Sequence, residues 1–84
     1  EFTVEKLDRN RWRVNGMLPV EDFQKIYPPL KGLQEVDTMG GLLVALKEVV
    51  PRVGESAMID GLQLIAVVAD DRRVRELVVK RSDR

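Results

Sequence analysis

The sequence contains no cysteine and no histidine, and these two absences exclude several kinds of chemistry. Without cysteine there is neither a disulfide framework nor a thiolate metal site. Without either residue type, the hydroxyl groups of the chain lack the usual bases that activate a nucleophile. We therefore predict no catalytic residue, including among the hydroxyl-bearing side chains Thr3, Tyr27, Thr38, Ser56 and Ser82.

Charge of one sign and long apolar runs are also missing. Fourteen basic residues balance fourteen acidic ones, so the formal net charge is zero. Because nucleic-acid-binding domains depend on an excess of Lys and Arg, nucleic acid is not a predicted partner. No apolar run approaches the ~20 residues that cross a bilayer, and the amino-terminal segment has no signal-peptide core. Direct membrane insertion is therefore not predicted.

Carboxylates gather at Glu35–Asp37 and at Asp70–Asp71. A hard cation needs several oxygen ligands that converge on one point, and no EF-hand loop is present. If strand geometry continues into the second group, its two side chains point to opposite faces. The sequence therefore predicts no specific metal site.

What is present is an ordinary globular composition of 84 residues, 44% hydrophobic and 33% charged. This length fits one domain with a single core. We therefore treat residues 1–84 as one domain. Because the chain begins without Met, we expect it to be a fragment of a longer protein.

Two short strands are predicted at the amino-terminal end, over Phe2–Leu7 and Arg11–Asn15, with a polar turn between them. In the second strand Trp12 and Val14 share one face, because side chains alternate along a strand. An exposed indole would suit stacking on an adenine or flavin ring, but the alternation favours a core position for Trp12. The strand is predicted to end at Gly16, since an Asn-Gly pair tolerates positive φ.

A first helix is predicted to begin with Pro19 in its first turn, where proline is well tolerated. Its apolar residues follow the i, i+3, i+4, i+7 spacing, and Pro28-Pro29 ends it. A loop follows over Lys31–Val36. The apolar positions of the helix are Phe23, Ile26, Tyr27 and Leu30.

A second, mostly buried helix is predicted after Asp37 and Thr38, which are both good N-cap residues. Only Lys47 and Glu48 are strongly polar within its apolar region, and Pro51 is predicted to end it. Its apolar stripe consists of Met39, Leu42, Leu43, Leu46, Val49 and Val50.

The last third of the chain reads as three strands, over Ser56–Ile59, Leu62–Ala69 and Val74–Lys80. Asp60-Gly61 between the first two is a strong signal for a two-residue hairpin turn. The middle strand, LQLIAVVA, is apolar on both faces and is predicted to be covered on each side. The residues after the last strand, 81–84, are predicted to fray. The whole pattern predicts an α+β fold of order ββααβββ, a mainly antiparallel sheet packed against two helices.

Gly40 and Gly41 stand in the first turn of the second helix, where glycine is an unfavourable choice. One explanation is that free N–H groups at Thr38, Gly40 and Gly41 bind a nucleotide phosphate, aided by the helix dipole. The other is that the glycines form a small-residue ridge with Val44 and Ala45, against which a neighbouring backbone packs. No phosphate-loop pattern is present, so close packing is the favoured interpretation.

Basic residues gather at the turn before the last strand and along that strand. They suit an anion or a partner protein. A solvated hairpin tip, in which Asp70 and Asp71 neutralise two of the charges, is the simpler interpretation. The basic residues are Arg72, Arg73, Arg75, Lys80 and Arg81.

Several motifs, in this order and spacing, resemble the transporter-associated domain of the CorC/HlyC type. They are RWRVNG, LPVEDF, DTMGGLL, VPRVGES and DGLQLIAVVADDRRVRELVVKR. The family pattern runs W-x-V-x-G, a short helix, T-x-G-G with two apolar residues, P-x-x-G-E and a closing strand pair. The matching positions are Trp12, Val14, Gly16, Thr38, Gly40, Gly41, Pro51, Gly54 and Glu55.

The resemblance implies an α+β fold similar to part of an FAD-binding-type domain. It also implies a place at the C-terminal end of a CorC-like membrane protein, or of some cation/proton antiporters. The implied partners are the CBS and membrane domains of the parent chain, on the cytoplasmic side of the bacterial inner membrane. The implied role is accessory, in the transport of magnesium, cobalt or other cations.

Three functions stay open at the level of the sequence. The first is a non-enzymatic regulatory or assembly module of a cation transporter. The second is a small-molecule sensor that binds an adenine nucleotide or flavin near Thr38, Gly40 and Gly41. The third is homodimerisation through an exposed sheet edge, without a ligand.

Overall fold

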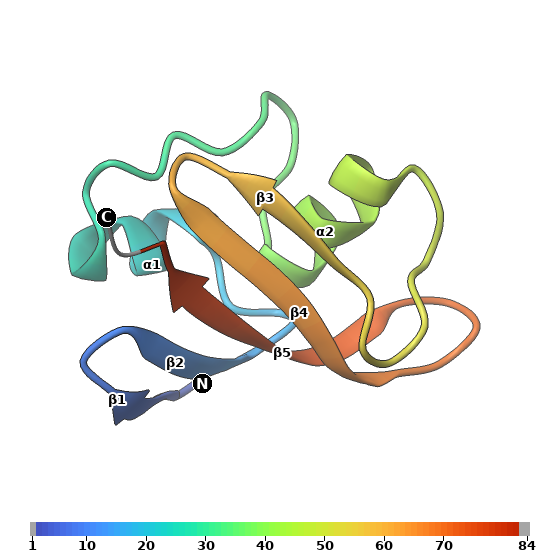
Figure 1. Ribbon diagram of the computed structural model, residues 1–84. Coiled ribbons are helices and arrows are strands. Elements are labelled where there is room, and N and C mark those ends of the chain that lie inside the picture. Colours follow the sequence, from blue (N-terminus) through green and yellow to red (C-terminus); the bar gives the residue numbers. More distant parts are fainter. Residues whose placement is uncertain (1, 83–84) are drawn as a thin grey trace.

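Five strands form one antiparallel sheet, and two helices pack on it (Figure 1). The computed structural model describes residues 2–82. Its element order is ββααβββ, so the predicted α+β class and order are confirmed. The elements are β1 (Val4–Asp8), β2 (Arg11–Asn15), α1 (Val20–Ile26), α2 (Met39–Lys47), β3 (Ser56–Ile59), β4 (Leu62–Ala69) and β5 (Val74–Arg81).

The strands lie in the order β1-β2-β5-β4-β3, so the last strand of the chain occupies the centre of the sheet. β5 pairs with β2 on one side and with β4 on the other, and Val79 lies opposite both Trp12 and Leu64. The central position of β5 joins the amino-terminal hairpin and the later strands into one sheet.

Both helices cover the same face of the sheet, and the core lies between them and the strands (Figure 1). Trp12 is 6% exposed, and its ring meets Phe23 of α1 edge to face with the ring centroids 5.5 Å apart. The predicted core position of Trp12 is therefore confirmed. The buried hydrophobic residues are Trp12, Val14, Leu18, Val20, Phe23, Leu30, Met39, Leu42, Leu43, Leu62, Leu64, Ala66, Val74, Leu77 and Val79.

The opposite face of the sheet carries neither of the two helices (Figure 1). Along β4, Leu64 and Ala66 are buried, whereas Ile65 and Val67 on the other face are only half-buried. The prediction that β4 is covered on both sides is therefore wrong. An antiparallel sheet is able to leave one face to solvent. Apolar side chains on the outer face of β4 therefore do not by themselves mean that another helix or sheet covers that face.

α2 is shorter than its apolar stripe suggested. The helix ends at Lys47, and Glu48 follows as the C-cap in the left-handed conformation, with φ of 64°. The predicted continuation to Val50, ended by Pro51, is therefore wrong. Val49 is 61% exposed, because the chain has already left the helix at this point.

Three smaller predictions change. Pro19 is the N-cap residue of α1 and not part of its first turn. β1 begins at Val4 and not at Phe2. Arg81 belongs to β5, where it pairs with Leu62 of β4, and its N–H also donates to the carbonyl of Asn10 at 2.6 Å. The end of the predicted tail, 83–84, lies outside the described residues.

Neither helix of the described residues is long and apolar enough to cross a membrane.

Candidate functional site

α2 begins against the backbone segment that leads from β2 to α1. We call this contact the α2 junction; it consists of residues 16–20, residues 37–41 and Val74. The two segments run antiparallel, with a β-bridge between Pro19 and Thr38. Three hydrogen bonds of 2.8 Å join them: Gly40 N–H to the Gly16 carbonyl, Met39 N–H to the Leu18 carbonyl and Val20 N–H to the Asp37 carbonyl.

Three N–H groups in the first turn of α2, those of Met39, Gly40 and Gly41, are already used by the protein. The N–H groups of Met39 and Gly40 donate across the junction. The N–H group of Gly41 donates to Oγ1 of Thr38 at 3.1 Å, so the prediction that Thr38 caps the helix is confirmed. The structure therefore brings Thr38, Gly40 and Gly41 together, but as a cap and a packing contact.

Gly40 lies against two backbone carbonyl groups. A Cβ atom at this position would stand 2.8 Å from the Gly16 oxygen and 2.9 Å from the Val74 oxygen. The prediction that a neighbouring backbone packs against the helix start is therefore confirmed for Gly40. For Gly41 it is wrong, because the nearest atom to a Cβ there is Oγ1 of Thr38, at 2.9 Å.

Gly16 is the tightest point of the junction, and its role was not predicted from the sequence. A Cβ atom would stand 2.0 Å from the Val74 oxygen, and the Gly16 N–H donates to the carbonyl of Arg75 at 2.7 Å. The strand ends before Gly16 as predicted, and the Leu18 N–H closes a turn onto the Asn15 carbonyl at 3.0 Å. Neither Asn15 nor Gly16 has positive φ, so the predicted reason for this end is wrong. Glycine is needed here because two backbones approach closely.

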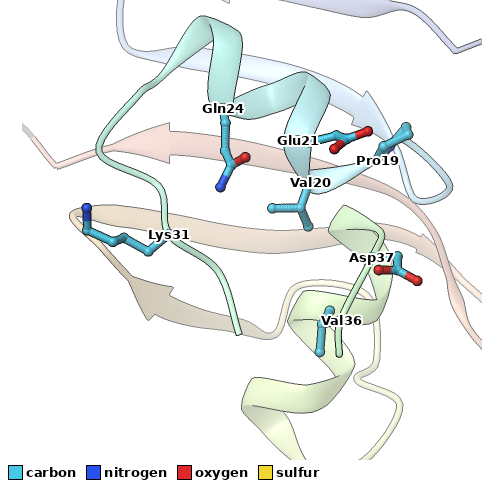
Figure 2. Close-up of a pocket in the computed structure, with 7 residues that line it drawn as sticks. All are labelled: Pro19, Val20, Glu21, Gln24, Lys31, Val36 and Asp37. Atoms are coloured by element: carbon cyan, nitrogen blue, oxygen red, sulfur yellow. The ribbon is translucent and has the colours of Figure 1, made fainter. Parts of the chain in front are cut away.

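A shallow pocket of about 320 Å³ opens beside the α2 junction, between α1 and the segment that leads into α2 (Figure 2). Lys31 lies at the opposite end from Asp37 in Figure 2, with Gln24 between them. The Gln24 amide donates to the Leu30 carbonyl at 2.9 Å, so it is engaged within the protein. The lining residues carry both signs of charge and select no single ligand class; they are Pro19, Val20, Glu21, Gln24, Lys31, Val36 and Asp37.

The acidic residues of the described part of the chain do not converge. Within residues 2–82, no three His, Cys, Asp or Glu side chains come together in a way that would hold a metal ion. Glu35 and Asp37, which the sequence places close together, are both exposed.

The basic turn between β4 and β5 is organised by Asp70. Its carboxylate accepts the N–H groups of Arg72 at 2.8 Å and Arg73 at 3.0 Å, and Nε of Arg75 donates to it at 2.7 Å. The hydrogen bond from the Arg72 backbone, followed by that from the Arg75 side chain, lowers the pKa of Asp70 to about 2. Asp71 makes none of the ion pairs found within residues 2–82, so only one of the two predicted carboxylates neutralises an arginine.

Sequence comparisons point to one family. The family model described as "Transporter associated domain" (CorC_HlyC) matches residues 5–83. The magnesium and cobalt efflux protein CorC of Escherichia coli K12 is 36% identical over 83 residues. The match covers 99% of this chain, but the chain spans only 28% of the length of that relative.

Solved structures share the fold. A Mg2+ and Co2+ transporter (CorC)-associated region from Neisseria meningitidis MC58 is 31% identical, with a TM-score of 0.86 over 93% of this chain and 96% of that one. A hemolysin domain from Enterococcus faecalis V583 is 24% identical, with a TM-score of 0.83 over 95% and 98% of the two chains. Because these solved chains are almost wholly covered, domains of this size and architecture fold as separate chains.

Proposed function

This chain belongs to the CorC/HlyC transporter-associated domain family, and from that membership we propose that it is a non-enzymatic accessory domain of a CorC-type cation transporter. The observation that carries the proposal is the 36% identity to the CorC magnesium and cobalt efflux protein over 99% of this chain. Magnesium and cobalt are therefore the proposed transported cations, and control or assembly of the transporter is the proposed role.

The proposal treats residues 1–84 as one domain of a longer membrane protein. Its proposed partners are the CBS and membrane domains of that parent chain, on the cytoplasmic side of the bacterial inner membrane. Such a domain acts through its own folded surface, so loss of its fold should have the same consequence as loss of its residues.

Deletion of residues 2–81 from the parent protein tests the proposal. At matched membrane levels of the parent, we expect the rate of Mg2+ and Co2+ efflux, or its control, to change. Gly16→Ala in the full-length parent should reproduce this change, because the new Cβ would stand 2.0 Å from the Val74 oxygen and disrupt the fold. Val53→Ser is the matched control, since Val53 is 61% exposed. Unchanged flux and unchanged assembly in both the deletion and Gly16→Ala would contradict the proposal.

Binding of an adenine nucleotide or flavin at Thr38, Gly40 and Gly41 stays a prediction, as does the similarity to part of an FAD-binding-type domain. A phosphate at this position would have to displace hydrogen bonds of the α2 junction. Thermal-shift measurements with ATP, AMP, FAD and NAD test the idea, because a ligand at 100 times its Kd adds about 2.7 kcal/mol to the free energy of unfolding. The absence of a shift at millimolar concentration would reject it.

A further inference from the structure

The two edges of the sheet differ in how they are protected against pairing with another strand. β1, at one edge, reads VEKLD and has a register irregularity between Lys6 and Asp8. β3, at the other edge, reads SAMI and pairs with β4 in unbroken register. Charged side chains and bulges are the usual devices that keep an edge strand from pairing, and the residues of β3 itself have neither. A bulge lies just before the strand, where the Gly54 N–H donates to the Ala66 carbonyl at 2.8 Å and the Ala66 N–H donates to the Glu55 carbonyl at 2.9 Å.

The free edge of β3 presents unpaired backbone groups. The two-residue turn after β3 has positive φ at both positions, 54° and 85°, as in a type I′ hairpin. The pair Ile59–Leu62 that closes this turn is then hydrogen-bonded, and bonding alternates along the strands from there. The N–H and C=O groups of Ser56 and Met58 therefore point away from β4. Outside the sheet ladder, no hydrogen bond among residues 2–82 reaches these groups.

We propose that β3 is a pairing edge for a second copy of this chain. Two β3 strands lie antiparallel about a twofold axis at Ala57, so that Ser56 of one copy faces Met58 of the other. Both residues have outward backbone groups, so each of the two Ser56–Met58 pairs closes two hydrogen bonds. The two five-stranded sheets become one continuous sheet.

The charge pattern favours a second copy of this chain as the partner of the β3 edge. In this register Glu55 of one copy faces Ile59 of the other, so no like charges oppose each other across the seam. The same arrangement at β1 would place Lys6 of one copy directly opposite Lys6 of the other, which is unfavourable. The chain has zero net charge, so two copies do not repel each other at a distance.

The outer face of the sheet adds apolar surface to the same seam. Met58 is 57% exposed. Ile65 lies opposite Ser56 on one side and opposite Val78 on the other, and both Ile65 and Val78 are half-buried. When two β3 strands pair, Met58, Ile65 and Val78 of one copy come next to the same three residues of the other. Burial of this apolar surface adds to the stabilisation that the hydrogen bonds of the seam provide.

Sedimentation velocity of the 84-residue chain over a range of concentrations tests the pairing. Met58→Pro removes an outward N–H but no bond of the β3–β4 ladder, and proline is tolerated on edge strands. We expect it to raise the dimer dissociation constant at least about tenfold, because two hydrogen bonds of the seam are lost. Met58→Thr keeps the N–H group and should retain dimerisation. The fluorescence of the single buried Trp12 establishes that both variants fold.

Disulfide formation tests the register. The natural chain has no cysteine, so Ala57→Cys introduces one thiol per copy. At the twofold axis the two Cα atoms lie about 4.5 Å apart, within disulfide range, and we expect a covalent dimer on mild oxidation. Lys6→Cys on β1 is the control, because Lys6 would stand at the twofold axis if β1 paired in the same way, and it should stay monomeric. A chain that is monomeric at all concentrations, a dimer that Met58→Pro leaves unchanged, or cross-linking at Lys6 in place of Ala57 would overturn the proposal.

Discussion

The two ends of α2 are held in place by different means. At the first turn, Gly40 lies against the backbone carbonyl oxygens of Gly16 and Val74, with no space for a methyl group. After the last turn, Glu48 occupies the left-handed conformation with φ of 64°. Gly54 in the following loop has φ of 95°, and nothing lies within 4 Å of its Cβ position.

This difference separates two reasons for which a position requires glycine. Gly16 and Gly40 are needed because other backbone atoms occupy the space of a side chain. Gly54 is needed only because L-residues rarely adopt its backbone conformation. Substitution by alanine should therefore distinguish the tightly packed start of α2 from the loosely packed loop after it.

Gly16→Ala should have the largest effect. Its Cβ would stand 2.0 Å from the Val74 oxygen, and a backbone atom is not free to rotate away. We expect the free energy of unfolding to fall by about 3 kcal/mol or more. Urea unfolding followed by Trp12 fluorescence measures the change. Gly54→Ala is the control and should lose only about 1–2 kcal/mol, from backbone conformation alone. Equal losses in the two variants would contradict the distinction.

Gly40→Ala and Gly41→Ala bring the comparison to adjacent residues. Alanine gains less than about 1 kcal/mol of helix propensity at either position, because both lie in the first turn of α2. At Gly40 the two carbonyl contacts should outweigh this gain and leave a net loss of about 1–2 kcal/mol. At Gly41 the new Cβ would stand 2.9 Å from Oγ1 of Thr38 and at an ordinary contact distance of 3.7 Å from Cγ1 of Val36. Both are side-chain atoms that can move, so the net change should stay below about 1 kcal/mol. A larger loss at Gly41 than at Gly40 would show that the cap, and not the junction, determines the stability of the helix start.

Local signals in the sequence were sufficient for the strands and for the core. Asp60-Gly61 fixed the bounds of β3 and β4, because the type I′ turn is encoded in two residues. The alternation in β2 placed Trp12 correctly, since side-chain direction follows from strand geometry alone.

The α2 junction was only partly predictable, because its partners are distant in the sequence. The Thr-x-Gly-Gly pattern indicated a helix start beside a close neighbour, and this was correct at Gly40. The requirement at Gly16 depends on Val74, which β5 brings into place only when the whole sheet has formed. The early end of α2 was missed for a different reason. Val49 and Val50 continue the apolar spacing, and Glu48 carries no signal for its left-handed conformation.

Glu48→Gly should stabilise the other end of α2. Glycine adopts positive φ without the steric cost that Glu48 bears, and it is the preferred residue after a helix. We expect the free energy of unfolding to rise by about 0.5–1 kcal/mol in the urea measurement. Ala45→Gly, at an exposed position inside the same helix, is the control and should lower it by about 1 kcal/mol. A loss at both positions would mean that the helix continues past Lys47 in solution.

The smallest effect is expected at Asp70, in the turn that carries Val74 into the α2 junction. The Arg72 N–H, and then the Arg75 guanidinium, lower the pKa of Asp70 from 3.8 to about 2. Because the folded-state pKa lies below the unfolded value, the stabilisation is complete above about pH 4 and is lost as the pH falls from about 4 to about 2. The Asp70 side chain is 36% exposed, so solvent screens the interaction and the contribution is small.

Asp70→Asn should remove this part of the pH dependence of the urea midpoint. Asp71→Asn is the control and should keep the natural profile, since Asp71 makes none of the ion pairs found within residues 2–82. If Asp70→Asn and the natural chain lose stability equally as the pH falls from about 4 to about 2, the Asp70 carboxylate contributes nothing to holding the turn. The pairing of β4 with β5 would then be sufficient to place the Val74 carbonyl against Gly16 and Gly40, and the junction would be independent of the charges beside it.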